Sequence, residues 1–119
     1  EGGRVVACGR RQAEGDALVA EVRQSGGEAR FVCADVSDEA QVQAVVAAAL
    51  AAFGQLDGAF NNAGILGDPD TPLHQSTAGN FQRVMAVNAL GVMLCMKHEI
   101  AAMLATGGGS IVNCASVLG

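Results

Sequence analysis

The chain has 119 residues, of which 50% are hydrophobic and only 3% aromatic, with no Tyr or Trp, and its formal net charge is −5. This length accommodates one domain at most, and an acidic balance without a Lys/Arg cluster argues against nucleic acid or an anionic membrane surface as a partner. No apolar run approaches the length of a membrane span, and no signal peptide is visible.

Strand and helix patterns alternate along the chain. Short apolar runs predict strands, and longer segments rich in Ala, Val and Leu that end at glycines predict helices. The predicted strands are 4–8, 29–34, 56–60 and 110–114, and the predicted helices are 13–25, 38–53 and 78–105. This alternation predicts an α/β fold, a doubly wound parallel sheet of the Rossmann-like kind with four strands and helices on both faces.

The helix patterns also predict caps and buried faces. Ser37 is the expected N-cap of the second helix, and Ser76 or Thr77 caps the third. The first helix has a mostly apolar side, formed by Ala17, Leu18, Ala20 and Val22. In the third helix, near-helical spacing defines a face toward the core, formed by Phe81, Val84, Met85, Val92, Met96 and Met103.

The cysteines show no CxxC spacing and sit inside apolar segments; they are Cys8, Cys33, Cys95 and Cys114. We expect them to be reduced, buried small hydrophobes of a cytoplasmic protein. His74 and His98 are not spaced with any cysteine pair, so no metal site is expected.

The third strand ends in Asn61-Asn62-Ala63-Gly64. Ligands of open α/β sheets bind just past the carboxyl ends of the strands, and Ala63 and Gly64 leave room there for a flat group to approach the backbone. Asn side chains carry both a donor and an acceptor, so they can tie together backbones that do not pair. The alternative is a plain Asn-Gly-type turn.

Two further strand ends carry charged residues. Arg10 and Arg11 follow the first strand, with Gly9 at the place where NAD-binding folds carry an acid. Guanidinium groups suit a 2′-phosphate, which favours NADP(H) over NAD(H); the alternative is a pair of solvated arginines. Asp35-Val36 follows the second strand, and its carboxylate can accept from an exocyclic amine such as that of adenine or cap the next helix.

Asn88 and Ser116 complete the candidate residues. Asn88 lies on the predicted core side of the long helix, where an amide must find hydrogen-bond partners. It either bonds a neighbouring strand or holds a water or backbone carbonyl near a reaction centre. Ser116 follows the fourth strand on the same sheet edge, where its hydroxyl can donate to a substrate carbonyl; its flanks do not form a nucleophile elbow.

Together these segments, in this order and spacing, resemble the short-chain dehydrogenase/reductase family of the single-domain type. The resemblance implies that Asn62, Ala63 and Gly64 border the cofactor, that Asp35 and Val36 contact adenine, and that Arg10 meets the 2′-phosphate. Asn88 and Ser116 match two of the family's four catalytic positions. The implied activity is hydride transfer between NADP(H), or alternatively NAD(H), and a small carbonyl or alcohol substrate.

The family's Gly-rich loop and Tyr-x-x-x-Lys motif do not occur in these residues. We therefore expect residues 1–119 to be part of one Rossmann-like dinucleotide-binding domain, without its first strand and its C-terminal portion, and to be inactive alone. The alternative function is a non-catalytic nucleotide-binding module. A receiver-like domain is disfavoured, because such a domain needs a cluster of acidic residues at the sheet edge and this sequence shows none. In the intact protein the 78–105 helix is expected to mediate homo-oligomer formation through Leu90, Met93, Leu94 and Leu104.

The family's strand order of 3-2-1-4-5 also predicts a gap. The strands at 4–8 and 56–60 would flank the absent first strand, which leaves a slot of about 10 Å between them. An incomplete sheet with unpaired edges inside its core is the expected result.

Overall fold

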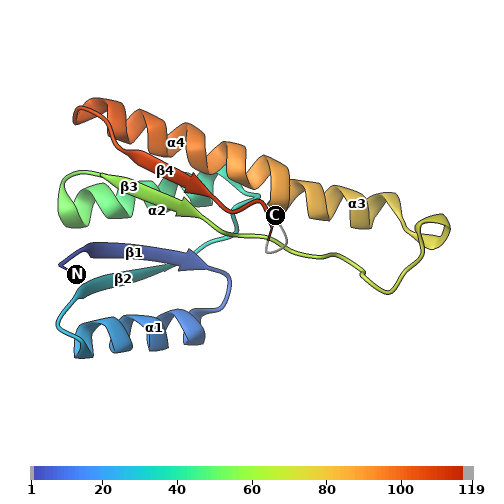
Figure 1. The fold of residues 1–119 in the computed structure, drawn as a ribbon, viewed down its shortest axis with the longest axis horizontal. Coiled ribbons are helices and arrows are strands. Elements are labelled where there is room, and N and C mark those ends of the chain that lie inside the picture. The colour runs from blue at the N-terminus through green and yellow to red at the C-terminus, as the bar shows by residue number, and fades with distance from the viewer. Residues whose placement is uncertain (1, 117–119) are drawn as a thin grey trace.

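The computed structural model describes residues 2–116 (Figure 1). Helices and strands alternate along the whole of this range. In chain order they are β1 (Arg4–Gly9), α1 (Gln12–Gln24), β2 (Glu28–Cys33), α2 (Glu39–Phe53), β3 (Gly58–Asn61), a 3-10 turn (Leu73–Gln75), α3 (Ala78–Met85), a π-helical turn (Ala86–Leu90), α4 (Gly91–Ala105) and β4 (Ser110–Asn113). The predicted order of elements is confirmed, and the outer boundaries of every predicted strand and helix differ by no more than two residues from those observed.

The four strands form two separate parallel pairs within the described residues. β1 pairs with β2, with Arg4 opposite Glu28, and β3 pairs with β4, with Gly58 opposite Ser110. Both pairings agree with the expected strand order, and β1 and β3 do not pair. The parallel α/β architecture is confirmed, but the strands do not join into one continuous sheet.

Helix α2 connects the two strand pairs. α1 packs against β2, α2 contacts both β1 and α4, and α4 lies along β3 (Figure 1). A small apolar core forms around the contact between α2 and the long helix, and it consists of Val36, Val42, Val87 and Leu94. Because Leu94 is only 5% exposed, it belongs to this core and not to the outer apolar surface that we predicted for it.

The start of α2 differs from the prediction. Asp38, not Ser37, is the N-cap, and its Oδ1 accepts from the main-chain N–H groups of Ala40 (3.0 Å) and Gln41 (3.4 Å). The Ser37 hydroxyl instead donates to Asp35 Oδ1 at 2.7 Å. A carboxylate accepts several N–H groups at once, so the aspartate satisfies the free helix donors better than the neighbouring hydroxyl. At the other end, Gly54 adopts φ 81° and stops the helix as predicted.

The long helix is continuous in direction but changes its winding at residues 86–90. Thr77 caps its start through its hydroxyl, which accepts from Asn80 N at 3.1 Å. The π-helical turn holds Asn88, and such turns are frequent at functional sites. α3 extends past the end of the strands (Figure 1), so Phe81 and Met85, 64% and 44% exposed, have no sheet to cover them. Their predicted burial is wrong for this reason.

Several further burial predictions are wrong. Leu18 of α1 is 45% exposed, because the helix turns Gly15 and not Leu18 toward β2. Cys8, Cys33 and Cys114 are exposed and Cys95 is half-buried, all four as free thiols. These residues lie in apolar segments whose outer faces no neighbouring element covers.

The unit Ala78–Leu104 has 27 residues and a mean hydropathy of 1.3 in its most apolar window, and by length and composition it could cross a membrane. Our expectation that no apolar segment approaches this length is therefore wrong. Core helices of globular proteins meet the same criterion. Here Lys97 bonds Glu39 of α2, and Glu99 bonds Asn61 of β3, so the polar groups of the helix bond neighbouring elements of the fold.

Candidate functional site

All four strands run in the same direction, so their carboxyl ends lie at one end of the molecule (Figure 1). The predicted site residues follow these ends: Arg10 and Arg11 after β1, Asp35 and Val36 after β2, Asn62 to Gly64 after β3, and Ser116 after β4. Asn88 reaches the same end from the π-helical turn through its bonds to Ile65. The fold thus brings the predicted residues to a common edge.

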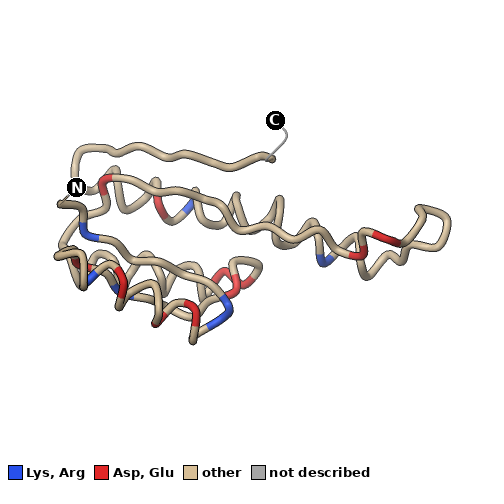
Figure 2. Tube along the Cα trace, turned by 60° about the horizontal axis from the view of Figure 1, so that its bottom comes forward, with Lys and Arg blue, Asp and Glu red and all other residues tan. Residues whose placement is uncertain are grey.

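The two arginines after β1 differ in their surroundings. Arg11 precedes α1 and forms an exposed ion pair with Glu14 at 3.1 Å. Arg10 has no ion pair among the described residues. In Figure 2 basic residues (blue) are interspersed with acidic ones (red) along the trace, and the turn between β1 and α1 is one of the basic places. Arg10 is therefore the cation that remains available for an anionic ligand.

Asp35 is an ionised acceptor at the end of β2. Its Oδ1 accepts from the Ser37 hydroxyl (2.7 Å) and from the Ser37 main-chain N–H (3.0 Å). These two hydrogen bonds lower the pKa of the Asp35 carboxyl, and the positive charge of Arg10 acts in the same direction. Asp35 does not cap α2, so this alternative from the sequence is excluded.

Val36 has its side chain in the core. It is 9% exposed, and a Cβ placed on Gly91 would lie 2.8 Å from Val36 Cγ2. The side chain therefore packs against the start of α4, where the glycine permits the close approach. A contact between Val36 and a ligand at this edge would have to use its main chain.

Asn61, the last residue of β3, ties three elements together. Its Nδ2 donates to Glu99 Oε1 of α4 at 2.7 Å and to Asn113 Oδ1 of β4 at 3.0 Å. Asn62, Ala63 and Gly64 follow as an exposed segment, and the Asn62 side chain has no hydrogen bond to any described residue. The predicted tying role therefore belongs to the first asparagine, and the second is free to meet a ligand.

Asn88 forms two hydrogen bonds with one residue. Its Oδ1 accepts from the main-chain N–H of Ile65, and its Nδ2 donates to the carbonyl of Ile65, both at 2.8 Å. Asn88 itself is exposed, so the predicted burial of its amide is wrong. Asn88 nevertheless holds a backbone carbonyl in place, that of Ile65. Ser116, the last described residue, is exposed three residues after β4.

Glu99 is not among the site residues predicted from the sequence. At 6% exposure it is the one buried charged residue in the described part of the chain. Desolvation raises the pKa of its carboxyl, while the hydrogen bond from Asn61 opposes this shift. The sequence did carry a signal for its burial. At helical spacing, Glu99 continues the series Val92, Met96 and Met103 that faces the core.

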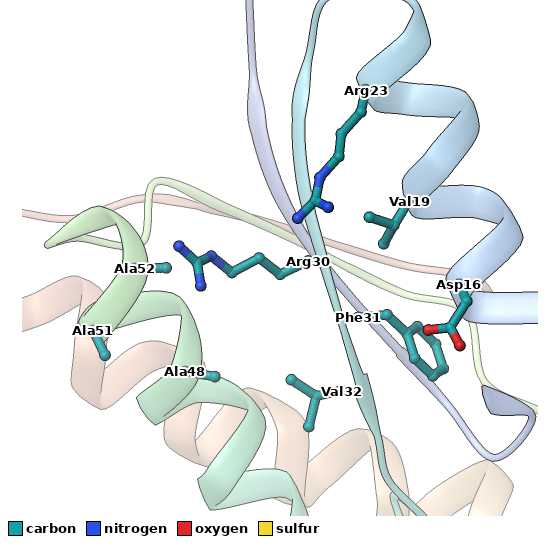
Figure 3. A pocket seen from close by; sticks show the side chains of 9 residues that line it. All are labelled: Asp16, Val19, Arg23, Arg30, Phe31, Val32, Ala48, Ala51 and Ala52. Atoms are coloured by element: carbon teal, nitrogen blue, oxygen red, sulfur yellow. The ribbon is translucent and has the colours of Figure 1, made fainter.

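A separate hollow lies away from these strand ends. It has a volume of about 630 Å³ and lies between α1, β2 and α2, at the edge of β2 that faces away from β1 (Figure 3). Arg23 and Arg30 extend into it from opposite faces of the strand (Figure 3). None of the predicted site residues lines it, so its size alone does not mark it as the functional site.

Three comparisons with known proteins bear on this arrangement. The chain is 48% identical over 106 residues to 2,5-dichloro-2,5-cyclohexadiene-1,4-diol dehydrogenase of Sphingobium indicum, which covers 88% of this chain and 41% of that protein. The crystal structure of levodione reductase matches with a TM-score of 0.86 and 37% identity, over 92% of this chain and 43% of that one. An NADH-dependent reductase complexed with NAD matches with a TM-score of 0.86 and 25% identity, over 98% of this chain and 50% of that one.

The chain thus spans about half or less of the length of these relatives. The family model described as short chain dehydrogenase matches residues 1–119. The chain therefore belongs to the short chain dehydrogenase family.

Proposed function

We propose that this chain is the central part of an oxidoreductase that transfers a hydride between NADP(H) and a small carbonyl or alcohol substrate. In this proposal residues 1–119 belong to one Rossmann-like dinucleotide-binding domain, and the full-length protein adds a strand between β1 and β3 and a C-terminal portion. The main support is the segment Asn62-Ala63-Gly64, which is exposed at the strand ends and held on both sides, by Asn61 and by Ile65.

The residues present suit a nicotinamide dinucleotide. Arg10 offers a cation without an ion pair to any residue that the structure describes, and the ionised Asp35 offers an acceptor for an exocyclic amine. The exposed Ala63 and Gly64 leave the backbone accessible to a flat ring. The bound cofactor would supply or accept the hydride. Ser116 would orient the substrate carbonyl, and Asn88 would hold the Ile65 carbonyl and a water with its remaining N–H.

The choice of NADP(H) rests on Arg10. A 2′-phosphate is bound well by a free guanidinium, whereas NAD-binding folds place an acid after this strand. Arg11 would contribute less, since it already pairs with Glu14. NAD(H) is the alternative, and one relative of similar structure is described as complexed with NAD.

The proposed partners are small molecules and a second copy of the chain, and the proposed location is the cytoplasm. Nucleic acid and membranes are not among the proposed partners. Leu90, Met93 and Leu104 expose 43%, 48% and 74% of their surface along the long helix. Only 17% of the most apolar window of this helix is buried within the chain. Exposed apolar surface of this kind favours an interface.

The cofactor assignment is tested with Arg10→Ala in the full-length protein. A charge-assisted hydrogen bond contributes about 1.5–3 kcal/mol, so the preference for NADPH over NADH should fall about ten- to a hundredfold. Arg30→Ala, which removes an arginine away from the strand ends, is the control and should leave the ratio unchanged. An unchanged ratio for Arg10→Ala would refute the assignment.

The second candidate function is a non-catalytic nucleotide-binding module, because these residues contain no Tyr for proton transfer. The sequence that follows Gly119 in the intact gene decides between the two. A Tyr-x-x-x-Lys motif about a dozen residues beyond Ser116 supports the enzyme, as the family's spacing implies, and its absence supports the module.

A further inference from the structure

Glu99 is a buried carboxylate with a defined partner. It lies on α4, faces β3, and accepts from Asn61 Nδ2 at 2.7 Å. A buried charge is costly unless it is paired or hydrogen-bonded, so a residue of this type at a core position needs a reason. An apolar side chain would fill the same place without that cost.

The contact with Glu99 determines which way the Asn61 amide points. An ionised carboxylate accepts hydrogen bonds only, so Asn61 must present Nδ2 to it. The second N–H of the same group donates to Asn113 Oδ1, at 3.0 Å. Both donors are thus used, and Asn61 cannot rotate without leaving the buried carboxylate unpaired.

The same helical unit holds the other end of the loop. Asn88 bonds both main-chain groups of Ile65, four residues after Asn61. Glu99 bonds the last residue of β3 and Asn88 bonds the loop that follows it, so both lie on the side of the long helix that faces this strand and its loop. The exposed segment Asn62-Ala63-Gly64 is therefore fastened at each end by one side chain of a single rigid element.

We propose that Glu99 is a positioning residue for the cofactor, acting through Asn61 on the segment Asn62-Ala63-Gly64. This rests on the function proposed above, in which that segment borders the cofactor. Glu99 itself does not touch the ligand. It holds Asn61, the residue before the segment, as Asn88 holds Ile65, the residue after it, so the backbone between them is in position before the cofactor arrives.

Other groups surround Glu99. The Cys95 thiol has its pKa raised to about 11, first by burial and then by the charge of Glu99, and the same charge contributes to a raised pKa of Cys8 after desolvation. Lys97 and His98 on the same helix bond Glu39 instead. Glu99 thus has no cationic partner within the described residues, and the Asn61 amide is its one bonded group.

The test uses four variants of the full-length protein. Glu99→Leu removes the acceptor and should raise the Kd for NADPH about tenfold, with the substrate KM within about twofold. Glu99→Gln keeps an acceptor oxygen and should stay within about threefold of the wild type. Asn61→Asp sets two carboxylates against each other and should be at least as impaired as Glu99→Leu. Adding Glu99→Gln to Asn61→Asp restores a donor–acceptor pair and should recover most of the affinity.

A second readout does not depend on the cofactor. Hydrogen exchange of the main-chain amides at 62–65 in ligand-free protein should accelerate in Glu99→Leu and return to normal in the double variant. Glu39→Gln is the matched control, because it removes another carboxylate bonded to α4 without touching Asn61. It should change neither exchange at 62–65 nor the Kd for NADPH.

The two proposals fail in different ways. If the wild type binds no nicotinamide dinucleotide, the proposed function and the cofactor part of this inference are both refuted, while exchange still decides whether Glu99 holds the loop. If the wild type binds NADPH but Glu99→Leu leaves exchange and Kd unchanged, the role of Glu99 is refuted. Failure of the double variant to improve on Asn61→Asp would also refute it.

Discussion

The β1–β2 pair and the β3–β4 pair are built from the same kind of strand, yet they are held in different ways. β2 has α1 on one face and α2 on the other (Figure 3). The Phe31 ring packs so closely on Gly15 of α1 that a Cβ there would lie 2.3 Å away. The β3–β4 pair has α4 along it and leaves Phe60 and Val112, which are opposite each other, 66% and 57% exposed.

Apolar packing is thus the main tertiary contact of the first pair, and side-chain hydrogen bonds are the main tertiary contact of the second. In the first pair, β2 is held by the close apolar contact of Phe31 with α1, and α2 lies against β1. In the second pair, the bonds of Asn61 to Glu99 and Asn113 connect β3 with α4 and β4. The candidate site lies at the end of the second pair, where directional hydrogen bonds specify backbone positions more narrowly than apolar contact does.

The largest effect is expected from separating this chain from the rest of the protein. The isolated 119 residues should oxidise no NADPH and should not behave as a soluble, protected domain, since β1 and β3 each present an unpaired edge. Side-by-side assays of the isolated chain and the full-length protein, with hydrogen exchange on both, check this. A monomeric, protected chain with reductase activity would show that the two halves suffice without a strand between them.

The packing of the first pair is tested by Gly15→Ala. Overpacking of a close contact typically costs 1–3 kcal/mol, so the urea midpoint of the full-length protein should fall despite the higher helix propensity of alanine. In a Phe31→Ala background, Gly15→Ala should destabilise the protein less, because the ring that the new methyl group would meet is no longer there. Gly79→Ala is the control, because a Cβ there meets nothing closer than Thr77 Oγ1 at 4.0 Å. A neutral Gly15→Ala would mean that α1 is not held by this contact.

The polar bonds of the second half are tested by Asn88→Ala. Loss of the bonds to Ile65 should lower kcat about tenfold and raise the substrate KM less, since the residue acts on the geometry of the reacting edge and not on substrate binding. Steady-state kinetics and urea unfolding of the full-length variant separate the two effects. Normal turnover in a less stable protein would make Asn88 purely structural.

The smallest effect concerns the contact between α2 and α4 that joins the halves. Hydrogen bonds from Lys97 and then from His98 lower the pKa of Glu39 below its ordinary value of 4.5. A depressed pKa in the folded state stabilises the protein above pH 4.5, and this stabilisation is lost as the pH falls through the folded-state pKa. Glu39→Gln should therefore slightly lower the urea midpoint near pH 6 and make no difference in strong acid. A difference that persists in acid would show that the bridge does not act through ionisation.

Much of the fold followed from local patterns. The elements and their order, the stop at Gly54 and the cap at Thr77 depend on neighbouring residues, which determine helix periodicity and satisfy helix ends. The places of Arg10, Asp35, Asn62 and Ser116 at one edge followed from strand direction alone, since parallel strands bring their carboxyl ends together. Local patterns and strand direction therefore suffice to predict the elements and the edge at which the candidate residues lie.

The sequence patterns did not predict which side chains are buried or which polar groups bond one another. Phe81 begins an apolar series at helical spacing and the three exposed cysteines lie in apolar segments, but no element covers them. Asn61 and Glu99 are 38 residues apart, and nothing local to either residue selects the other. Burial and long-range hydrogen bonds depend on how helices and strands pack across the chain, and propensity and spacing within one segment carry no information about that packing.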